Sequence, residues 1–276
     1  MQIGLSDLSA PAVVSAIKAN WAEFYTHLGR APGAELSAGP YLSWVLTGIP
    51  DAFLNVVFRT DLPLDRAGEV IDEALAHFKA RHVTRLSWLA ETRGVNPGRH
   101  LVSRGLTFEE GGTGMAADLG AVPGSLPAPA GLAIVPVEDR ATLQPWIQVM
   151  RVGFGLPEHA EKRLLDLFAA VSLAPPMRTY LALLDGRPVA TSQLFLAAGV
   201  AGIYNVTCLP EARGQGIGAA VTLAPLLEAR RQGYGLSILQ ASDLGYQVYR
   251  RLGFDDYGRL PLYLFSSADD GQQTAM

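Results

Sequence analysis

The chain has 276 residues, 49% of them hydrophobic and 17% charged, which is enough for one large domain or two ordinary ones. Its formal net charge of −4 argues against the basic face of a nucleic-acid-binding protein, and no run of about eighteen apolar residues is present to span a membrane. Cys208 is the only cysteine, the five histidines lack metal-ligand spacing, and the first residues do not resemble a signal peptide. We therefore expect a cytoplasmic protein without a metal site, a nucleic-acid partner or a membrane partner.

The first half of the chain has the pattern of a mixed α/β domain. Apolar spacing predicts helices over 11–28, 64–80 and 97–104. Alternating and β-branched segments predict strands over 41–46, 52–59, 83–89 and one or two more within 106–119. Prolines and glycines then predict a linker over 123–131, so that the first domain spans 1–122.

The second half predicts a similar order of elements over 132–265. Strands are expected at 132–137, 178–184, 188–196, 200–208, 236–241 and within 254–265, with a hairpin turn at Asp185-Gly186. Helices are expected at 140–154, 158–172, 217–231 and 243–252. The polar tail 266–276 is predicted to be disordered.

Three glycines within five residues mark the junction between the strand 200–208 and the helix 217–231. Gly214, Gly216 and Gly218 allow positive φ and close approach to the backbone, and the following helix N-terminus favours an anion such as phosphate. Arg213 adds a positive charge. The loop lacks the Lys-Ser/Thr ending of a Walker loop and the spacing of a dinucleotide fingerprint. An ordinary tight turn without a ligand remains the alternative.

A weak internal repeat relates the two halves. The segment 250–256 (RRLGFDD) aligns without a gap on 104–110 (RGLTFEE), at an offset of 146 residues. Together with the similar order of elements, this repeat predicts a duplicated domain.

Two separated motifs resemble the GNAT N-acetyltransferase superfamily. The first is Arg213-x-x-Gly216-x-Gly218, and the second is the segment 241–254, which matches Asn-x-x-Ala-x-x-x-Tyr-x-x-x-Gly-Phe at its last three fixed positions. Ser242 and Gly245 stand where that family usually has asparagine and alanine. The resemblance implies an α/β (α+β) fold of two GNAT-like domains. Each would be a mixed, mostly antiparallel twisted sheet with helices on both faces and a splayed central pair of parallel strands.

The resemblance also implies acetyl-CoA as co-substrate and Tyr249 as the general acid that protonates the leaving thiolate. Ser242 has the alternative role of a helix cap, and Tyr249 that of a core aromatic residue. No general base is evident: Glu211 and Asp243 are candidates, and Tyr204 and Asn205 could position a water. The cofactor-binding residues implied by the resemblance are Val206, Cys208, Arg213, Gly214, Gln215, Gly216, Ile217, Gly218, Ala219 and Ser242.

The first half departs from the family at the corresponding loop. Residues 60–65 contain no glycine, Asp61 and Asp65 would repel phosphate, and Pro63 has no N–H to donate. Ser103 replaces the tyrosine. We expect a degenerate GNAT-like domain without a cofactor loop, which shapes the acceptor pocket or an interface; a homodimer stays open.

The function that these features predict is N-acetyl transfer from acetyl-CoA to a primary amine of a small molecule or peptide by direct attack. The alternative from a different class is a non-catalytic acyl-CoA-binding sensor or scaffold. An aminoacyl or long-chain acyl transferase on the same doubled fold is a further variant. The sequence does not identify the acceptor, because loops that vary within the family form its pocket.

Overall fold

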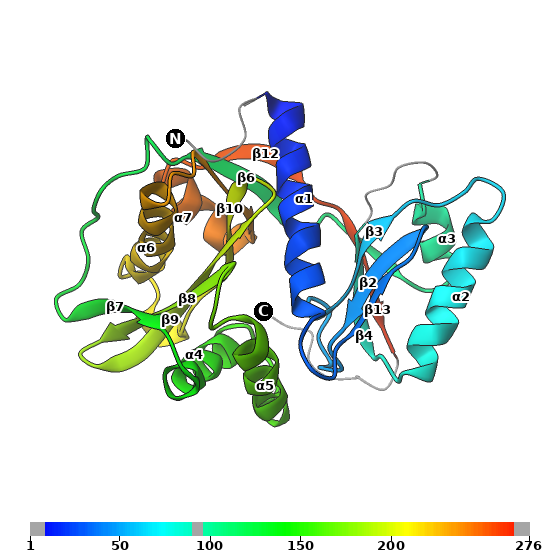
Figure 1. The fold of residues 1–276 in the computed structure, drawn as a ribbon, viewed down its shortest axis with the longest axis horizontal. Helices are drawn as coiled ribbons and strands as arrows, with labels where there is room; N and C mark the ends of the chain where they lie inside the picture. The colour runs from blue at the N-terminus through cyan, green and yellow to red at the C-terminus, as the bar shows by residue number, and fades with distance from the viewer. Residues whose placement is uncertain (1–8, 90–95, 268–276) are drawn as a thin grey trace. The chain divides into compact units, whose positions relative to one another are not determined.

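The computed structural model describes residues 9–89 and 96–267, and the chain divides into two compact units (Figure 1). Unit 1 comprises Met1–Phe24 and Gly112–Gly258, and unit 2 comprises Tyr25–Gly111 and Arg259–Met276. Each unit is built around one mixed sheet. Most of the tail for which disorder was predicted, residues 268–276, lies outside the described residues.

Unit 1 contains a seven-stranded sheet in the order β12-β6-β11-β10-β9-β8-β7. Strand β10 runs parallel to β11, whereas the pairs from β10 through β9 and β8 to β7, and the pair β11–β6, are antiparallel. The strands are β6 (Thr113–Asp118), β7 (Leu132–Val137), β8 (Met177–Leu184), β9 (Arg187–Ala197), β10 (Val200–Cys208), β11 (Leu236–Ala241) and β12 (Asp255–Arg259).

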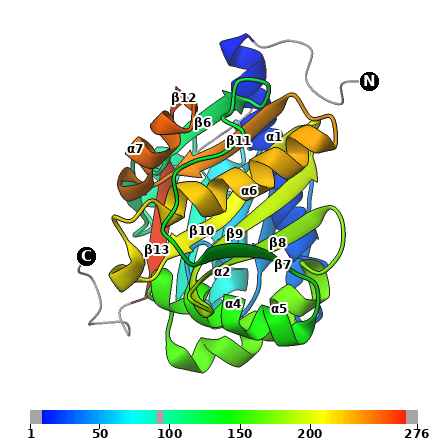
Figure 2. The same cartoon turned by 90° about the vertical axis from the view of Figure 1, so that its left-hand side faces the viewer.

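Helices cover both faces of this sheet (Figure 2). Successive side chains along β9 point to opposite faces of the sheet. The Ser192 side chain lies on the face covered by α6, where its hydroxyl donates to the Val221 carbonyl at 2.7 Å. The next residue, Gln193, points to the opposite face and contacts Thr179, which bonds to Ser172 at the end of α5. The helical elements of unit 1 are α4 (Arg140–Gly153), η1 (Glu158–Ala160), α5 (Glu161–Val171), η2 (Pro210–Ala212), α6 (Ile217–Arg231), α7 (Asp243–Arg251) and the first part of α1 (Ala10–Leu28).

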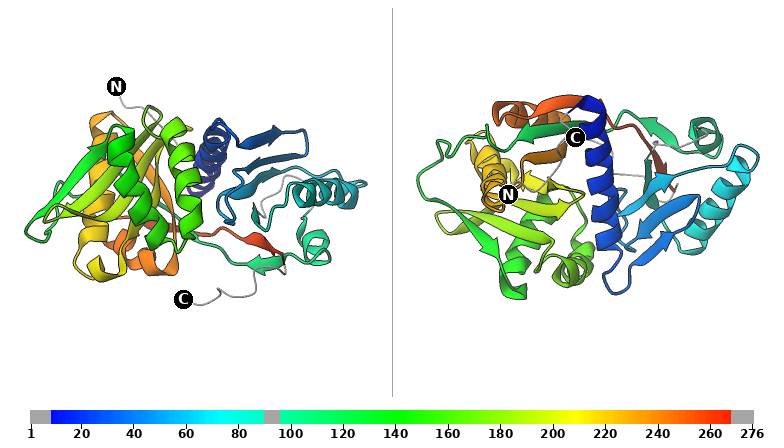
Figure 3. Two further views of the ribbon diagram at one scale, coloured as in Figure 1. Left: turned by 90° about the horizontal axis from the view of Figure 1, so that it is seen from below. Right: turned by 45° about the horizontal axis from the view of Figure 1, so that its top comes forward.

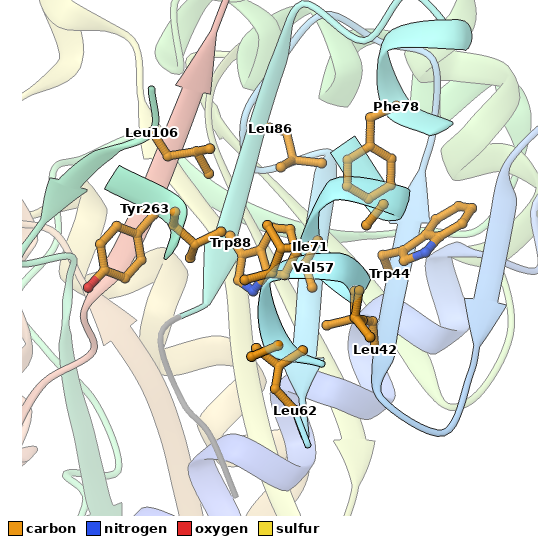
Figure 4. Close-up of a cluster of buried hydrophobic side chains, with 14 of the residues drawn as sticks. Leu42, Trp44, Val57, Leu62, Ile71, Phe78, Leu86, Trp88, Leu106 and Tyr263 are labelled. Carbon is orange, nitrogen blue, oxygen red and sulfur yellow. The ribbon is translucent and has the colours of Figure 1, made fainter. Parts of the chain in front are cut away.

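Unit 2 contains a six-stranded sheet in the order β1-β2-β3-β4-β13-β5. Its core packs side chains of α2 and α3 against the sheet, as in Figure 4, where Ile71 and Phe78 lie beside Val57, Leu86 and Trp88. Its elements are β1 (Glu35–Ala38), β2 (Leu42–Leu46), β3 (Asn55–Thr60), α2 (Ala67–Ala80), β4 (Arg85–Leu89), α3 (Gly98–Val102), β5 (Thr107–Glu109) and β13 (Leu262–Ser266).

Each sheet contains one strand from the opposite half of the sequence. Strand β6 follows β5 directly in the chain, yet it pairs with β11 in unit 1. Strand β13, near the other end of the chain, lies between β4 and β5 in unit 2, where Figure 3 shows the red strand beside a green one. The units therefore differ from the continuous domains 1–122 and 132–265 expected from the sequence, because the chain passes from one sheet to the other after β5 and after β12.

The two sheets share one irregularity. In β10 one extra residue lies between the pairs Gln193/Tyr204 and Thr191/Thr207, and in β3 one extra residue lies between Arg59 and Val57. Each bulged strand is followed by a helix and pairs in parallel with the strand after that helix. This correspondence agrees with the predicted internal repeat. Across the described ranges, no helix combines the length and apolar character needed to cross a bilayer.

Candidate active site

The central parallel strands of unit 1 separate part-way along their length. Strands β10 and β11 pair only through Ala201/Ser237 and Gly202/Ile238, although β10 continues to Cys208 and β11 to Ala241. The bulge lies just beyond this pairing, with Asn205 at φ +50°. Because the ladder ends there, the backbone groups of β10 beyond Gly202 are left for another partner on that side. The splayed strand pair implied by the sequence is therefore present.

Strand β10 leads into the N-terminus of α6, which has the features of an anion site. Gly216 occupies the N-cap position at φ +83°, and no side chain caps the helix. The N–H groups of the first turn, Ile217 to Ala219, have no helical carbonyl to bond, and the helix dipole adds partial positive charge. Arg213 Nε donates to the Cys208 carbonyl at 3.2 Å, which holds this cation beside the turn.

Open space surrounds the glycine loop. A Cβ on Gly214 would meet nothing within 4 Å, and the nearest atom to one on Gly216 is the Pro127 carbonyl oxygen at 3.7 Å. Glycine is required at both positions by positive φ rather than by crowding, and the backbone stays accessible. Of the predicted cofactor residues, 213–216 are exposed, whereas the Ile217 side chain is buried and offers only its backbone N–H.

Tyr249 lies on α7 and packs in the apolar core together with Ile203 of β10 and Leu239 of β11. Its ring is buried, meets Phe254 edge to face at 6.0 Å, and packs on Gly245, where a Cβ would lie 2.7 Å from Cε2. Burial, with a smaller contribution from Cys208, raises the pKa of Tyr249 above its ordinary range, so the hydroxyl keeps its proton at neutral pH. Burial likewise raises the pKa of Cys208 to about 11 against the opposing effect of Arg213, so this thiol is a poor nucleophile.

The splayed strands, the glycine loop and the buried tyrosine all lie within residues 143–254, which match the profile of the Acetyltransferase (GNAT) family. The chain carries a GNAT acetyltransferase domain. Its fold is shared by solved structures of low sequence identity. A GCN5-related N-acetyltransferase from Kribbella flavida has a TM-score of 0.67 at 19% identity, with 96% of this chain and 97% of that chain covered.

Two further structures match over most of their length. A tandem GNAT protein from the clavulanic acid biosynthesis pathway has a TM-score of 0.58 at 17% identity, covering 96% of this chain and 98% of that one. A functionally unknown conserved protein from Staphylococcus epidermidis has a TM-score of 0.60 at 14% identity, covering 84% and 93%. No curated protein sequence matches the chain. At these identities the solved structures show the fold of the chain and not its substrate.

Two of the predicted cofactor-binding residues have side chains with structural roles in the GNAT domain. Ser242 is the N-cap of α7, and its side chain accepts from the Gly245 N–H at 3.3 Å. The Val206 side chain packs in the apolar core, so its predicted contact with a cofactor involves the backbone. Neither β10 nor β11 contains an acidic residue, and Glu211 is exposed on η2. The residue that removes the proton from an acceptor is therefore not supplied by the splayed strands.

Sequence reasoning missed a row of buried polar side chains behind the bulge of the GNAT domain. Thr191 and Gln193 on β9 are fully buried, and Thr191 Oγ1 donates to the Asn205 carbonyl at 2.7 Å. Gln193 contacts the Asn205 side chain. Three consecutive polar residues, Thr191-Ser192-Gln193, within a strand whose two faces are both covered, are the signal that could have revealed this row.

A buried side chain bridges the corresponding strands of unit 2. Strands β3 and β4 pair through Val56/Ser87 and Val57/Trp88, and beyond this point the Trp88 indole N–H donates to Thr60 Oγ1 at 2.9 Å. The indole is fully buried in the cluster of Figure 4. Since the side chain bridges the ends of the two strands, it fills the place where the GNAT domain is open.

Proposed function

We propose that unit 1 transfers an acetyl group from acetyl-CoA to a primary amine of a small molecule or peptide. The observation that carries the proposal is the uncapped N-terminus of α6, which the glycine loop connects to a strand that has separated from its parallel neighbour. The residues present fit the co-substrate: the first-turn N–H groups and Arg213 suit a pyrophosphate. The free edge of β10 suits the amide groups of an extended pantetheine arm.

The remaining residues have roles that follow from their protonation and position. Backbone N–H groups near the bulge polarise the thioester carbonyl. The amine nitrogen attacks this carbonyl carbon, the C–S bond breaks, and Tyr249 donates its proton to the departing thiolate, while the amine gives up its proton to water. The neutral Cys208 forms no covalent bond. Unit 2, with its acidic loop and its filled strand pair, binds no second acetyl-CoA.

Binding of the co-substrate is tested by calorimetric titration of acetyl-CoA and CoA into the wild type and Gly216→Glu. A carboxylate beside the pyrophosphate opposes binding by about 1–4 kcal/mol, which weakens the Kd about 5- to 1,000-fold. Gly186→Glu is a matched control, since Gly186 has similar φ (+77°), open surroundings and a place in the β8–β9 turn. Equal binding by wild type and Gly216→Glu, or no binding by the wild type, refutes this site.

Transfer is tested by incubating the protein with acetyl-CoA and a panel of primary amines: ethanolamine, ethylamine, spermidine, glucosamine and a lysine-containing peptide. We expect acetylated product by mass spectrometry and a kcat about 100-fold lower in Tyr249→Phe. The lack of a carboxylate on the splayed strands favours one alternative, a non-catalytic acyl-CoA sensor. Tight acetyl-CoA binding without product from any amine would support that alternative.

A further inference from the structure

A chain of side-chain hydrogen bonds crosses the sheet of unit 1 and ends at the bulge. The Thr179 hydroxyl bonds to the Ser172 carbonyl at 3.2 Å, and Gln193 Nε2 bonds to Thr179 Oγ1 at 3.0 Å. Gln193 Oε1 then meets Asn205 Nδ2 at 2.6 Å. Thr179 and Gln193 are buried, so the row is shielded from solvent.

The direction of these bonds is fixed from one end. A backbone carbonyl can only accept, so the single hydroxyl proton of Thr179 is donated to Ser172. Thr179 Oγ1 must then accept from Gln193, which turns Nε2 toward Thr179 and Oε1 toward Asn205. Asn205 must in turn present Nδ2 to Gln193. Reversing the amides would place two acceptors face to face at the Thr179–Ser172 contact.

This order leaves Asn205 Oδ1 as an unused hydrogen-bond acceptor. Within the described ranges no donor to this oxygen is present, and Asn205 is only half-buried. Its φ of +50° belongs to the bulge, three residues beyond the last β10–β11 pair at Gly202. Contact with Gln193 places the carboxamide on the face covered by α4 and α5, opposite the face of α6.

The facing strand carries a second unused polar group at the same level. Gln240 on β11 lies two residues beyond Ile238, the partner of Gly202, and strand alternation puts it on the same face as Ile238. Its Nε2 is buried and makes no hydrogen bond to any of the residues that the structure describes. An unpaired buried N–H is destabilising, so a ligand that accepts from it would gain affinity.

We propose that Asn205 and Gln240 hold the acceptor: Asn205 Oδ1 accepts from the amino group, and Gln240 Nε2 donates to an oxygen on the neighbouring carbon. The proposal rests on the proposed function and adds the substrate class, a primary amine with an adjacent oxygen atom. Since neither strand has a carboxylate, the site favours the neutral amine, whose lone pair is free to attack.

The role of Asn205 is tested with ethanolamine as the acceptor. Asn205→Gly keeps the positive φ and removes the carboxamide, and we expect its KM for ethanolamine to rise about tenfold while the Kd for acetyl-CoA stays within about twofold. Asn205→Asp retains the accepting oxygen and loses the N–H that bonds to Gln193, so its KM for ethanolamine should stay below that of Asn205→Gly, although the new carboxylate also attracts the protonated amine. A merely structural role predicts instead that both variants fail alike, because both lose the bond to Gln193.

The role of Gln240 is tested by the ratio of kcat/KM for ethanolamine to that for ethylamine. We expect a ratio above one in the wild type that falls about tenfold in Gln240→Leu and is unchanged in Gln247→Leu, an exposed glutamine on α7. An unchanged ratio in Gln240→Leu, or an unchanged ethanolamine KM in Asn205→Gly, overturns the proposal while acetyl transfer itself stands. A wild type that binds acetyl-CoA but acetylates no amine overturns the proposed function, and this inference with it.

Discussion

The Asn20 side chain on α1 contacts both β9 and β10 near the turn that joins these two strands of unit 1. Its Nδ2 donates to the Ala197 carbonyl at 2.9 Å and lies 3.5 Å and 3.4 Å from the carbonyls of Phe195 and Val200. Its Oδ1 accepts from the Tyr204 hydroxyl at 2.7 Å. The side chain is fully buried. Asn20→Asp changes one NH2 group into an oxygen and alters nothing else in shape.

The expected loss of folding stability follows from the groups that surround the new oxygen atom. At neutral pH the substitution removes the bond to Ala197 and places a buried carboxylate against three carbonyl oxygens, which destabilises the fold by about 3–5 kcal/mol. Burial raises the folded-state pKa of the new acid above its unfolded value of about 3.9. Stability is therefore highest when the acid is protonated and is lost as the pH rises through the folded-state pKa. At pH 4.5 the acid can donate a proton to Ala197, and the loss should shrink to about 1–2 kcal/mol.

Urea unfolding of wild type and Asn20→Asp at pH 4.5 and 8 measures the loss in the free energy of unfolding at each pH. The control is Asn96→Asp, the same chemical change at an exposed residue whose Oδ1 accepts from the Gly98 N–H. An Asn20→Asp variant as stable as the wild type at pH 8, or one with the same deficit at both pH values, would refute the assigned bonds.

Two further outcomes check the electrostatics of the site and the state of unit 2. Burial raises the pKa of Cys208 from its ordinary value of 9.0 to about 11, so about 100-fold less of it is thiolate at pH 8 than for a free thiol. Iodoacetamide should therefore alkylate Cys208 about 100-fold more slowly than glutathione, as followed by mass spectrometry; equal rates would contradict this. Trp88→Ala should lower the free energy of unfolding by about 3–5 kcal/mol and leave the Thr60 hydroxyl without its indole donor, yet acetyl-CoA should still bind once per chain by calorimetry. A stoichiometry of two would contradict the interpretation of unit 2.

Local pattern was sufficient to predict most elements. The bounds of β7, β10 and β11 agree with the predicted strands at 132–137, 200–208 and 236–241, because each is a short apolar run between turn residues. The turn at Asp185-Gly186 is confirmed, with both residues at positive φ. The glycine loop was found for a similar reason, since the glycines and the helix start lie next to one another in the sequence.

The sequence revealed less wherever the structure depends on distant residues. Strand β1 has only four residues and contains no β-branched or aromatic side chain, so it gives little local signal. The predicted 64–80 helix begins at Ala67, since the residues after Pro63 form a turn instead. The residue pattern of 106–119 predicts one or two strands, and nothing in it indicates that β5 and β6 belong to different sheets. The Thr179–Gln193–Asn205 row was missed because its members lie on three strands.

Because each sheet contains a strand from the opposite half of the sequence, the order of synthesis affects when each sheet can fold. The sheet of unit 2 lacks an interior strand until residues 262–266 have been translated, because β13 stands between β4 and β5. Strand β5 has no hydrogen-bonded neighbour in that sheet before then. During synthesis the strands made from the first hundred residues therefore cannot complete their sheet until nearly the whole chain has been translated. Until then the edge of β4 stays unpaired and is prone to aggregation. We expect nascent chains that end before residue 262 to depend on chaperones.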